Sequence, residues 1–246
     1  LVPFDFVEFP EYAGIGYATL RRRLERHELP GVSLAVRIHG SLELIDQAEG
    51  VPATELGRLR MYRMERLALK LADVVLGPSK TMCAQYGWGH GLEAERLVVS
   101  PPPMKVLLHD LKPARRAPDP AHFLLYGKLQ EVKGCDTFVQ AGVTLLLTAA
   151  EIPWRFTIVG RDTYCARHQQ MASVCIRKLV PPDLRPSFEF HPGIPRAELN
   201  EMCVRPLAAV VPSRFESFCL AAHELRAVGL PLIVPPLPAF RDWLTE

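Results

Sequence analysis

The stretch Leu207-Ala-Ala-Val-Val-Pro-Ser-Arg-Phe-Glu-Ser-Phe-Cys-Leu-Ala-Ala-His-Glu224 decides the fold of this chain. Its first part, Leu207 to Pro212, is an apolar run of the kind that forms a strand buried on both faces. We expect a helix to begin near Phe218, after a short polar turn. A buried strand that leads directly into a helix is typical of a parallel sheet, in which ligands bind beyond the carboxyl ends of the strands.

Similar apolar runs recur along the chain with helical segments between most of them. In the second half we expect further strands at Phe123–Tyr126, Phe156–Val159, Phe188–Phe190 and Leu232–Val234. In the first half we expect strands at Phe4–Phe9, Ser33–Ile38 and Val74–Leu76. Short buried strands that alternate with helices predict an α/β protein with two Rossmann-like parallel-sheet domains. Lys, Arg, Asp and Pro mix between these halves, so we expect domains at 1–105 and 121–246 and a linker at 106–120.

Composition excludes several classes of protein. The formal net charge of +2 and the lack of a long basic face argue against a nucleic-acid partner. No apolar run reaches the roughly 18 residues that a membrane span requires. The six cysteines form no C-x-x-C pair, which argues against a zinc site and a disulfide scaffold and favours a reducing compartment. We therefore expect a cytoplasmic protein. For the arginine-rich stretch 17–29 we prefer a solvated helix face, with contact to the anionic inner face of a membrane as the alternative.

Two lysines follow the first strand of the second half. In the sequence Tyr126-Gly-Lys-Leu-Gln-Glu-Val-Lys-Gly134, Lys128 and Lys133 are five residues apart across a turn. Gly127 lets the backbone leave the strand tightly. Two ammonium groups that converge on one place suit a diphosphate, although two solvated loop lysines would give the same pattern.

The turn before the predicted helix at Phe218 indicates an anion site. Backbone amides at a helix N-terminus and the helix dipole both favour a phosphate. Glu216 precedes this helix and Glu224 lies about 9 Å along it, so the two carboxylates are spaced to contact different parts of one extended ligand. The alternative is a surface acid near a helix N-terminus and a helical acid in a salt bridge.

With these residues in view, most of the chain resembles a GT-B glycosyltransferase of family 4. The E-x7-E pattern of that family is matched by Glu216 and Glu224. The resemblance implies that Glu216 contacts the transferred sugar and that Glu224 binds the nucleotide ribose. It implies that amides of the Phe218–Leu220 segment meet the diphosphate and that Ser217 belongs to the same donor site. It further implies that Lys128, where the family usually has Arg, and Lys133 neutralise that diphosphate. Cys219 departs from the family, which usually has Gly there.

Further residues follow other predicted strands. His39 precedes Gly40 at a strand end and resembles the family's first-domain histidine near the transferred sugar; a loop histidine bonded to backbone is the alternative. Gly14 and Gly16 would line the acceptor side, although a helix-opening loop explains them equally well. Gly160 and Arg161 would lie near the donor on the same argument from strand ends.

The expected function is retaining transfer of a sugar, of the hexosyl type, from a nucleoside-diphosphate sugar to a glycan, lipid or other small acceptor. Glu216, His39 and Lys133 are the predicted catalytic residues. No D-x-D pair occurs, so we expect neither a metal ion nor a cofactor. The family's opening strand and closing elements are missing, which indicates an N-terminal domain that is incomplete. The alternatives are a truncated or inactive relative that binds nucleotide or a partner without transfer, and an epimerase of nucleotide sugars.

Overall fold

A computed structural model describes residues 4–104, 118–165 and 167–244. Contacts divide the chain into two compact units. The first unit is the chain up to Pro103, together with Phe215–Phe218 and the segment from Pro236 on. The second unit is Met104–Arg214 and Cys219–Pro235. Most of the expected linker, residues 106–117, lies outside the described residues, and its last two positions already belong to a strand.

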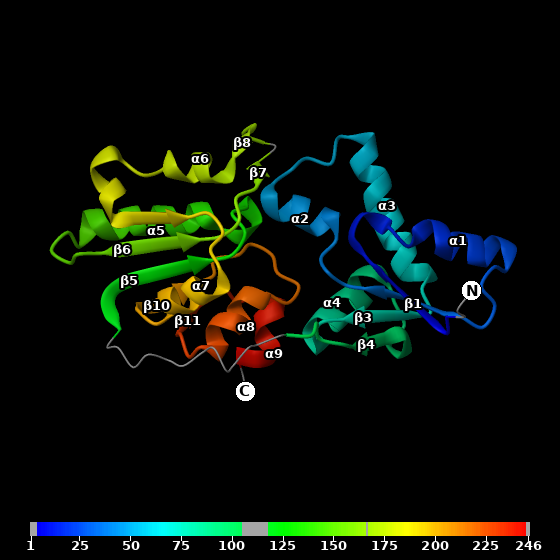
Figure 1. Ribbon diagram of the computed structural model, residues 1–246. Helices are drawn as coiled ribbons and strands as arrows, with labels where there is room; N and C mark the ends of the chain where they lie inside the picture. The colour runs from blue at the N-terminus through cyan, green and yellow to red at the C-terminus, as the bar shows by residue number, and fades with distance from the viewer. Residues whose placement is uncertain (1–3, 105–117, 166, 245–246) are drawn as a thin grey trace. The chain divides into compact units, whose positions relative to one another are not determined.

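The first unit contains a four-stranded parallel sheet of strand order β1-β2-β3-β4 (Figure 1). Its elements are β1 (Phe6–Pro10), η1 (Tyr12–Gly14), α1 (Tyr17–Arg26), β2 (Ser33–Arg37), α2 (Leu42–Glu49), α3 (Leu56–Leu71), β3 (Val74–Gly77), α4 (Lys80–His90), η2 (Ala94–Arg96) and β4 (Leu97–Val99), with α9 (Pro238–Leu244) from the chain's end. The three strands expected in this half are confirmed; β4 was not predicted.

One hydrophobic core joins this sheet to its helices. Leu34 and Val36 of β2 pack with Leu20 of α1, Leu69 of α3 and Met82 of α4. Successive strands are neighbours, so every crossover moves in the same direction along the sheet. Right-handed crossovers of this kind place their helices on one face. The predicted site residues of this unit lie in turns at the carboxyl ends of two strands: Gly14 and Gly16 follow β1, and His39 follows β2.

The second unit contains a five-stranded parallel sheet of order β11-β10-β5-β6-β9. Its elements are β5 (Asp119–Tyr126), η4 (Glu131–Lys133), α5 (Cys135–Thr148), β6 (Arg155–Val159), β7 (Tyr164–Cys165), β8 (Gln170–Met171), α6 (Ala172–Arg177), η5 (Pro182–Ser187), β9 (Phe188–His191), α7 (Arg196–Cys203), β10 (Pro206–Val210), α8 (Leu220–Ala227) and β11 (Leu232–Ile233). The five strands expected here are confirmed. The antiparallel hairpin of β7 and β8 was not predicted.

The order of the strands fixes where this sheet can bind a ligand. From β5 the chain passes to β6 and β9 on one side, then returns to β10 and β11 on the other. Helices α5 and α6 share a core with β5, β6 and β9, and Figure 1 shows α7 and α8 toward the other side of the sheet. The direction of winding thus reverses between β5 and β10, which is where open α/β sheets bind ligands.

Within the described ranges, no helix combines the length and the apolar character that a membrane crossing requires. All six cysteines are free thiols, in agreement with the expected lack of a disulfide scaffold.

Candidate active site

The loops that follow β5 and β10 pack tightly against each other at the reversal point. Gly134 adopts a left-handed backbone (φ +67°), and a Cβ there would lie 2.0 Å from the Pro212 carbonyl oxygen. The Arg214 amide donates to the Val132 carbonyl oxygen at 2.8 Å. Only glycine permits both this conformation and this approach. The loop that carries Lys133 is therefore held against the chain that leads from β10 toward α8.

Arg214 ties the two loops together through its side chain. Its guanidinium donates to the Glu131 carbonyl oxygen and, at 2.6 Å, to Asp136 Oδ2. The hydrogen bond to Asp136 raises the pKa of Arg214 above its usual value. No local pattern predicts this role for Arg214, because its partners lie 83 and 78 residues away along the chain.

A second close approach joins the ends of β5 and β6. A Cβ on Gly160 would lie 1.5 Å from the Gly127 carbonyl oxygen. The Gly127 amide donates to the Val159 carbonyl oxygen at 3.0 Å, and the Leu129 amide donates to the Arg161 carbonyl oxygen at 3.0 Å. Two of the predicted cations, Lys128 and Arg161, are exposed at this edge, and Lys133 is half-buried. Gly160 thus has a packing role that brings the loops of Lys128 and Arg161 together.

Helix α8 begins at Leu220, two residues later than expected. The cause is Cys219, which adopts a left-handed backbone (φ +64°, ψ +69°) and so stands outside the helix. Glu224 is consequently about 6 Å along the helix, not 9 Å. No side chain caps this N-terminus. Amides of a first helical turn have no carbonyl partner within their own helix, and together with the dipole they form an anion site.

Two predicted glutamates differ in their surroundings. Glu216 is buried, whereas Glu224 on α8 is half-buried. The residue before Glu224, His223, is also half-buried, and burial lowers the pKa of its imidazole. Contacts place Glu216, Ser217 and Phe218 in the first unit, while Cys219, Leu220 and Glu224 belong to the second. The expected strand-to-helix turn thus contributes residues to both units.

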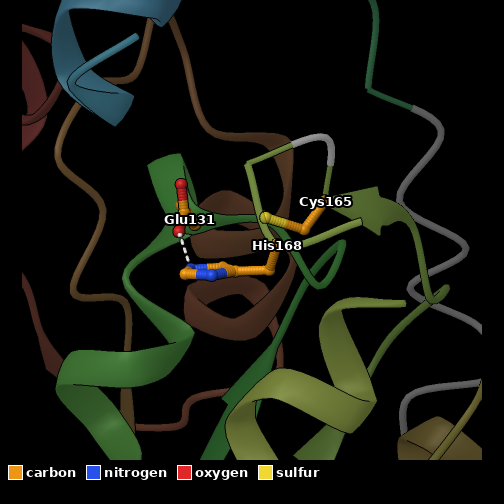
Figure 2. A group of neighbouring side chains, drawn as sticks. All are labelled: Glu131, Cys165 and His168. Carbon is orange, nitrogen blue, oxygen red and sulfur yellow. Dashed lines mark hydrogen bonds and ion pairs between the residues drawn. The ribbon is translucent and has the colours of Figure 1, made fainter. Parts of the chain in front are cut away.

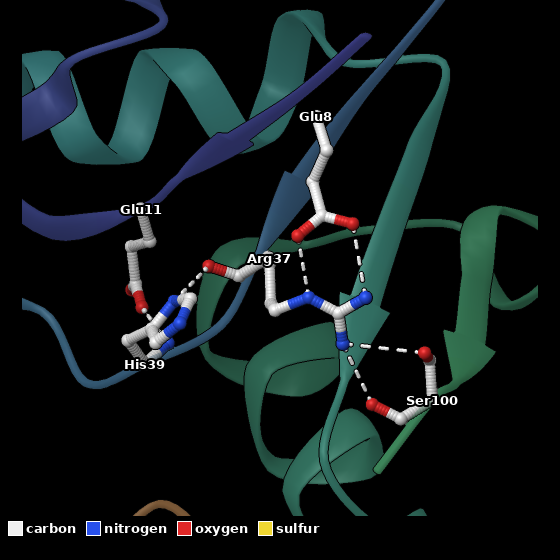
Figure 3. A network of polar contacts seen from close by, with 5 residues as sticks. All are labelled: Glu8, Glu11, Arg37, His39 and Ser100. Carbon is white, nitrogen blue, oxygen red and sulfur yellow. Dashed lines mark hydrogen bonds and ion pairs between the residues drawn. The ribbon is translucent and has the colours of Figure 1, made fainter. Parts of the chain in front are cut away.

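In the first unit, His39 lies at the carboxyl end of β2 and its side chain is exposed. Its Nδ1 lies 3.1 Å from the Arg37 carbonyl oxygen, as Figure 3 shows. The Ser217 hydroxyl donates to the His39 carbonyl oxygen at 2.8 Å. A Cβ on Gly40 would lie 2.7 Å from the Phe215 ring. The His39 turn therefore packs against the Phe215–Phe218 segment within this unit.

The turn at His39 rests on a buried carboxyl group. Glu11 Oε2 accepts from the amides of His39 and Gly40 at 3.2 and 3.1 Å and from the Tyr86 hydroxyl at 3.3 Å. Burial, with a smaller contribution from the charge of Glu65, raises the pKa of Glu11 to about 7. Among the described residues, no partner hydrogen-bonds to Glu11 Oε1. No local pattern indicates this arrangement, because the partners of Glu11 lie 28 to 75 residues away along the chain.

An ion pair fixes the same strand ends from another side. Arg37 forms a fork with Glu8 at 2.6 and 2.9 Å and donates to the carbonyl and hydroxyl oxygens of Ser100 at 2.8 and 3.2 Å (Figure 3). The hydrogen bond from Arg37 lowers the pKa of Glu8. This network links β1, β2 and the end of β4, and it holds the strand that presents His39.

The two glycines expected on the acceptor side each have a packing role. A Cβ on Gly14 would lie 2.5 Å from Met64 Cβ, and one on Gly16 would lie 2.6 Å from the Phe9 ring. They allow η1 and the start of α1 to approach α3 and β1. Contact with an acceptor remains a prediction for both.

The second half of the chain matches a known protein family. Residues 120–246, just over half of the chain, match the profile of a family described as glycosyl transferases group 1. Among curated proteins, no sequence matches the chain significantly.

Several solved structures share the fold. Sucrose-phosphate synthase from Thermosynechococcus elongatus superposes with a TM-score of 0.67 and 19% identity, over 97% of this chain and 57% of that one. The pneumococcal O-GlcNAc transferase GtfA, solved in complex with UDP and GlcNAc, gives 0.64 and 16% over 97% and 43%. An Escherichia coli trehalose-6-phosphate structure bound with UDP-2-fluoro glucose gives 0.67 and 13% over 100% and 62%. The chain therefore spans about half the length of these proteins, which share the GT-B fold with it.

Proposed function

Since the chain belongs to the family of group 1 glycosyl transferases, we propose that it binds a nucleoside-diphosphate sugar and transfers the sugar with retention of anomeric configuration. The observation that carries this proposal is the packing of the Lys133 loop against the chain that leads from β10 to α8. This packing supports a diphosphate site that combines ammonium groups with the first amides of a helix.

The second unit supplies charge for the leaving group. As the bond from the sugar to the diphosphate breaks, negative charge builds on the phosphate oxygens. Lys128, Lys133 and the α8 N-terminus would stabilise this charge, and preorganised electrostatics of this kind is usually the largest catalytic contribution. In this scheme the diphosphate needs no metal ion to balance its charge.

The remaining roles follow the family pattern. Glu216 would hold hydroxyls of the transferred sugar, and Glu224 would hold the ribose. His39 would line the site of the transferred sugar, with its turn fixed by Glu11. The departing phosphate would act as the base for an acceptor hydroxyl that attacks from the same face. The acceptor is a glycan, lipid or other small molecule.

The test is release of nucleoside diphosphate from a panel of nucleotide sugars, with and without candidate acceptors. We expect Glu216→Ala and Lys133→Ala each to lower the rate by at least about 100-fold, because each removes a charge-assisted contact made in the transition state. Exposed Glu95→Ala is the matched control and should retain the full rate. Undiminished turnover in both site variants would refute the assignment. Acceptor-independent conversion of the sugar would point to an epimerase.

A further inference from the structure

Three side chains with different metal-binding atoms meet beside the α5–α6 layer of the second unit. Glu131 lies on η4, Cys165 ends β7, and His168 lies in the turn between β7 and β8. One ligand atom from each lies within 4.8 Å of the others, and Figure 2 shows the three side chains pointing toward one another. We propose that Glu131, Cys165 and His168 bind a divalent transition metal of the zinc type.

The spacing of the three atoms suits tetrahedral coordination. Bonds of about 2.0 Å to oxygen and nitrogen and about 2.3 Å to sulfur place tetrahedral ligands roughly 3.3 to 3.6 Å apart. His168 Nε2 already lies 3.1 Å from Glu131 Oε1. The three ligand atoms lie within 4.8 Å of one another, so a shift of little more than about 1 Å would bring the third atom to the required distance.

The donor set selects the class of metal. A thiolate, an imidazole and a carboxylate together favour zinc and its neighbours over magnesium or calcium, which prefer oxygen ligands alone. Three protein ligands leave a fourth position for water or for another side chain. Cys175 lines the same pocket, which has a volume of about 370 Å³.

Without a metal, the Glu131 carboxylate contacts two neighbouring side chains. Glu131 pairs with His168 at 3.1 Å and with Arg167 at 4.0 Å. The side chains of Arg167 and His168 are about half exposed, so each contact contributes little to stability. Metal ligands bind in their deprotonated forms, so metal binding should weaken as the pH falls. The cluster is thus a competent site that costs little to rearrange.

Spectroscopy with cobalt tests the site directly, because Co²⁺ substitutes for zinc and reports on its ligands. We expect metal-stripped protein to bind one equivalent of Co²⁺ with a thiolate charge-transfer band and strong visible bands of a tetrahedral site. Zn²⁺ should abolish these bands by displacement. Calorimetry with Zn²⁺ alone should show a Kd at least about 100-fold weaker in Cys165→Ser and in His168→Ala, because each loses a ligand.

Matched controls separate this site from adventitious binding to the other thiols and imidazoles. Cys203→Ser and His27→Ala, which change residues outside the cluster, should keep the cobalt spectrum and the zinc affinity of the parent. Circular dichroism should confirm that all variants are folded; for the two cluster variants this is expected, since Cys165 and His168 lie in a short surface hairpin. An unchanged spectrum in Cys165→Ser or His168→Ala would overturn the proposal. So would an equal loss of affinity in the controls.

Discussion

Replacing Glu11 by glutamine should stabilise the protein at neutral pH and leave it nearly unchanged in acid. Glu11 is fully buried and accepts hydrogen bonds from two amides and the Tyr86 hydroxyl through one oxygen only. Glutamine has almost the same shape and can accept the same bonds through its carbonyl oxygen. Unlike the carboxyl group, it never has to carry a buried negative charge.

The magnitude follows from the pKa of Glu11, which burial raises from 4.5 to about 7. Each unit of pKa shift corresponds to about 1.4 kcal/mol, so the ionised form costs the folded protein about 3 kcal/mol. Below pH 4.5 the carboxyl group is protonated in both the folded and unfolded states, and the cost is absent. As the pH rises through 7, the ionised form of Glu11 lowers the free energy of unfolding of the parent by this amount. The glutamine variant should show no such decrease.

Urea unfolding between pH 4.5 and 8 measures this difference. A Trp154→Phe background removes the tryptophan of the second unit, so that Trp243 of α9 reports on the first. The free energy of unfolding of Glu11→Gln minus that of the parent should grow by about 3 kcal/mol across this range. Other titrating groups occur in both proteins and cancel. Exposed Glu93→Gln controls for the amide substitution itself. A constant difference between Glu11→Gln and the parent at every pH would refute the reasoning.

Three further predictions concern the second unit. In urea unfolding, Gly160→Ala should lower the free energy of unfolding by roughly 2–3 kcal/mol, because the added Cβ would overlap the Gly127 carbonyl. The control is Gly89→Ala on α4, where a Cβ meets open space, and it should be neutral or stabilising. Cys219→Gly should be about 1 kcal/mol more stable than Cys219→Ala in thermal unfolding, since both lose the thiol and only glycine accepts the left-handed backbone freely; equal stabilities would contradict this. Arg214→Lys should lower the free energy of unfolding by about 1 kcal/mol although it keeps the charge, because lysine cannot contact Asp136 and the η4 carbonyl together. An unchanged midpoint of urea unfolding would show that Arg214 does not stabilise the contact between the two loops.

The sheets were predictable because their strands are short apolar runs. Phe156–Val159 is buried as the sequence suggested, whereas the run that begins at Leu207 is buried only in part, since Ala208, Ala209 and Val211 are buried and Leu207 is exposed. Parallel strands buried on both faces leave a signal in local composition that does not depend on distant contacts. The position of the candidate site at the strand ends followed from the same signal.

The remaining features depend on residues far apart in sequence. Glu11 acquires its character from Tyr86, 75 residues away, and Arg214 from Asp136, 78 residues away. The cluster of Glu131 with His168, 37 residues away, contains no C-x-x-C pattern, so no local sequence signal indicates it. The late start of α8 has a different cause: Cys219 takes a backbone conformation that propensity assigns to glycine. Tertiary packing settles such details, and no local pattern encodes them.

Equilibrium binding of nucleoside diphosphates tests the central claim most directly. Calorimetry with UDP, GDP and ADP would identify the diphosphate that the protein binds best. We expect its Kd to rise about tenfold or more in Lys128→Ala and in Lys133→Ala, since a charge-assisted contact contributes about 1.5–3 kcal/mol. Exposed Lys70→Ala should leave that Kd unchanged. One Kd shared by the parent and all three variants, or no binding of any diphosphate by the parent, would contradict the account.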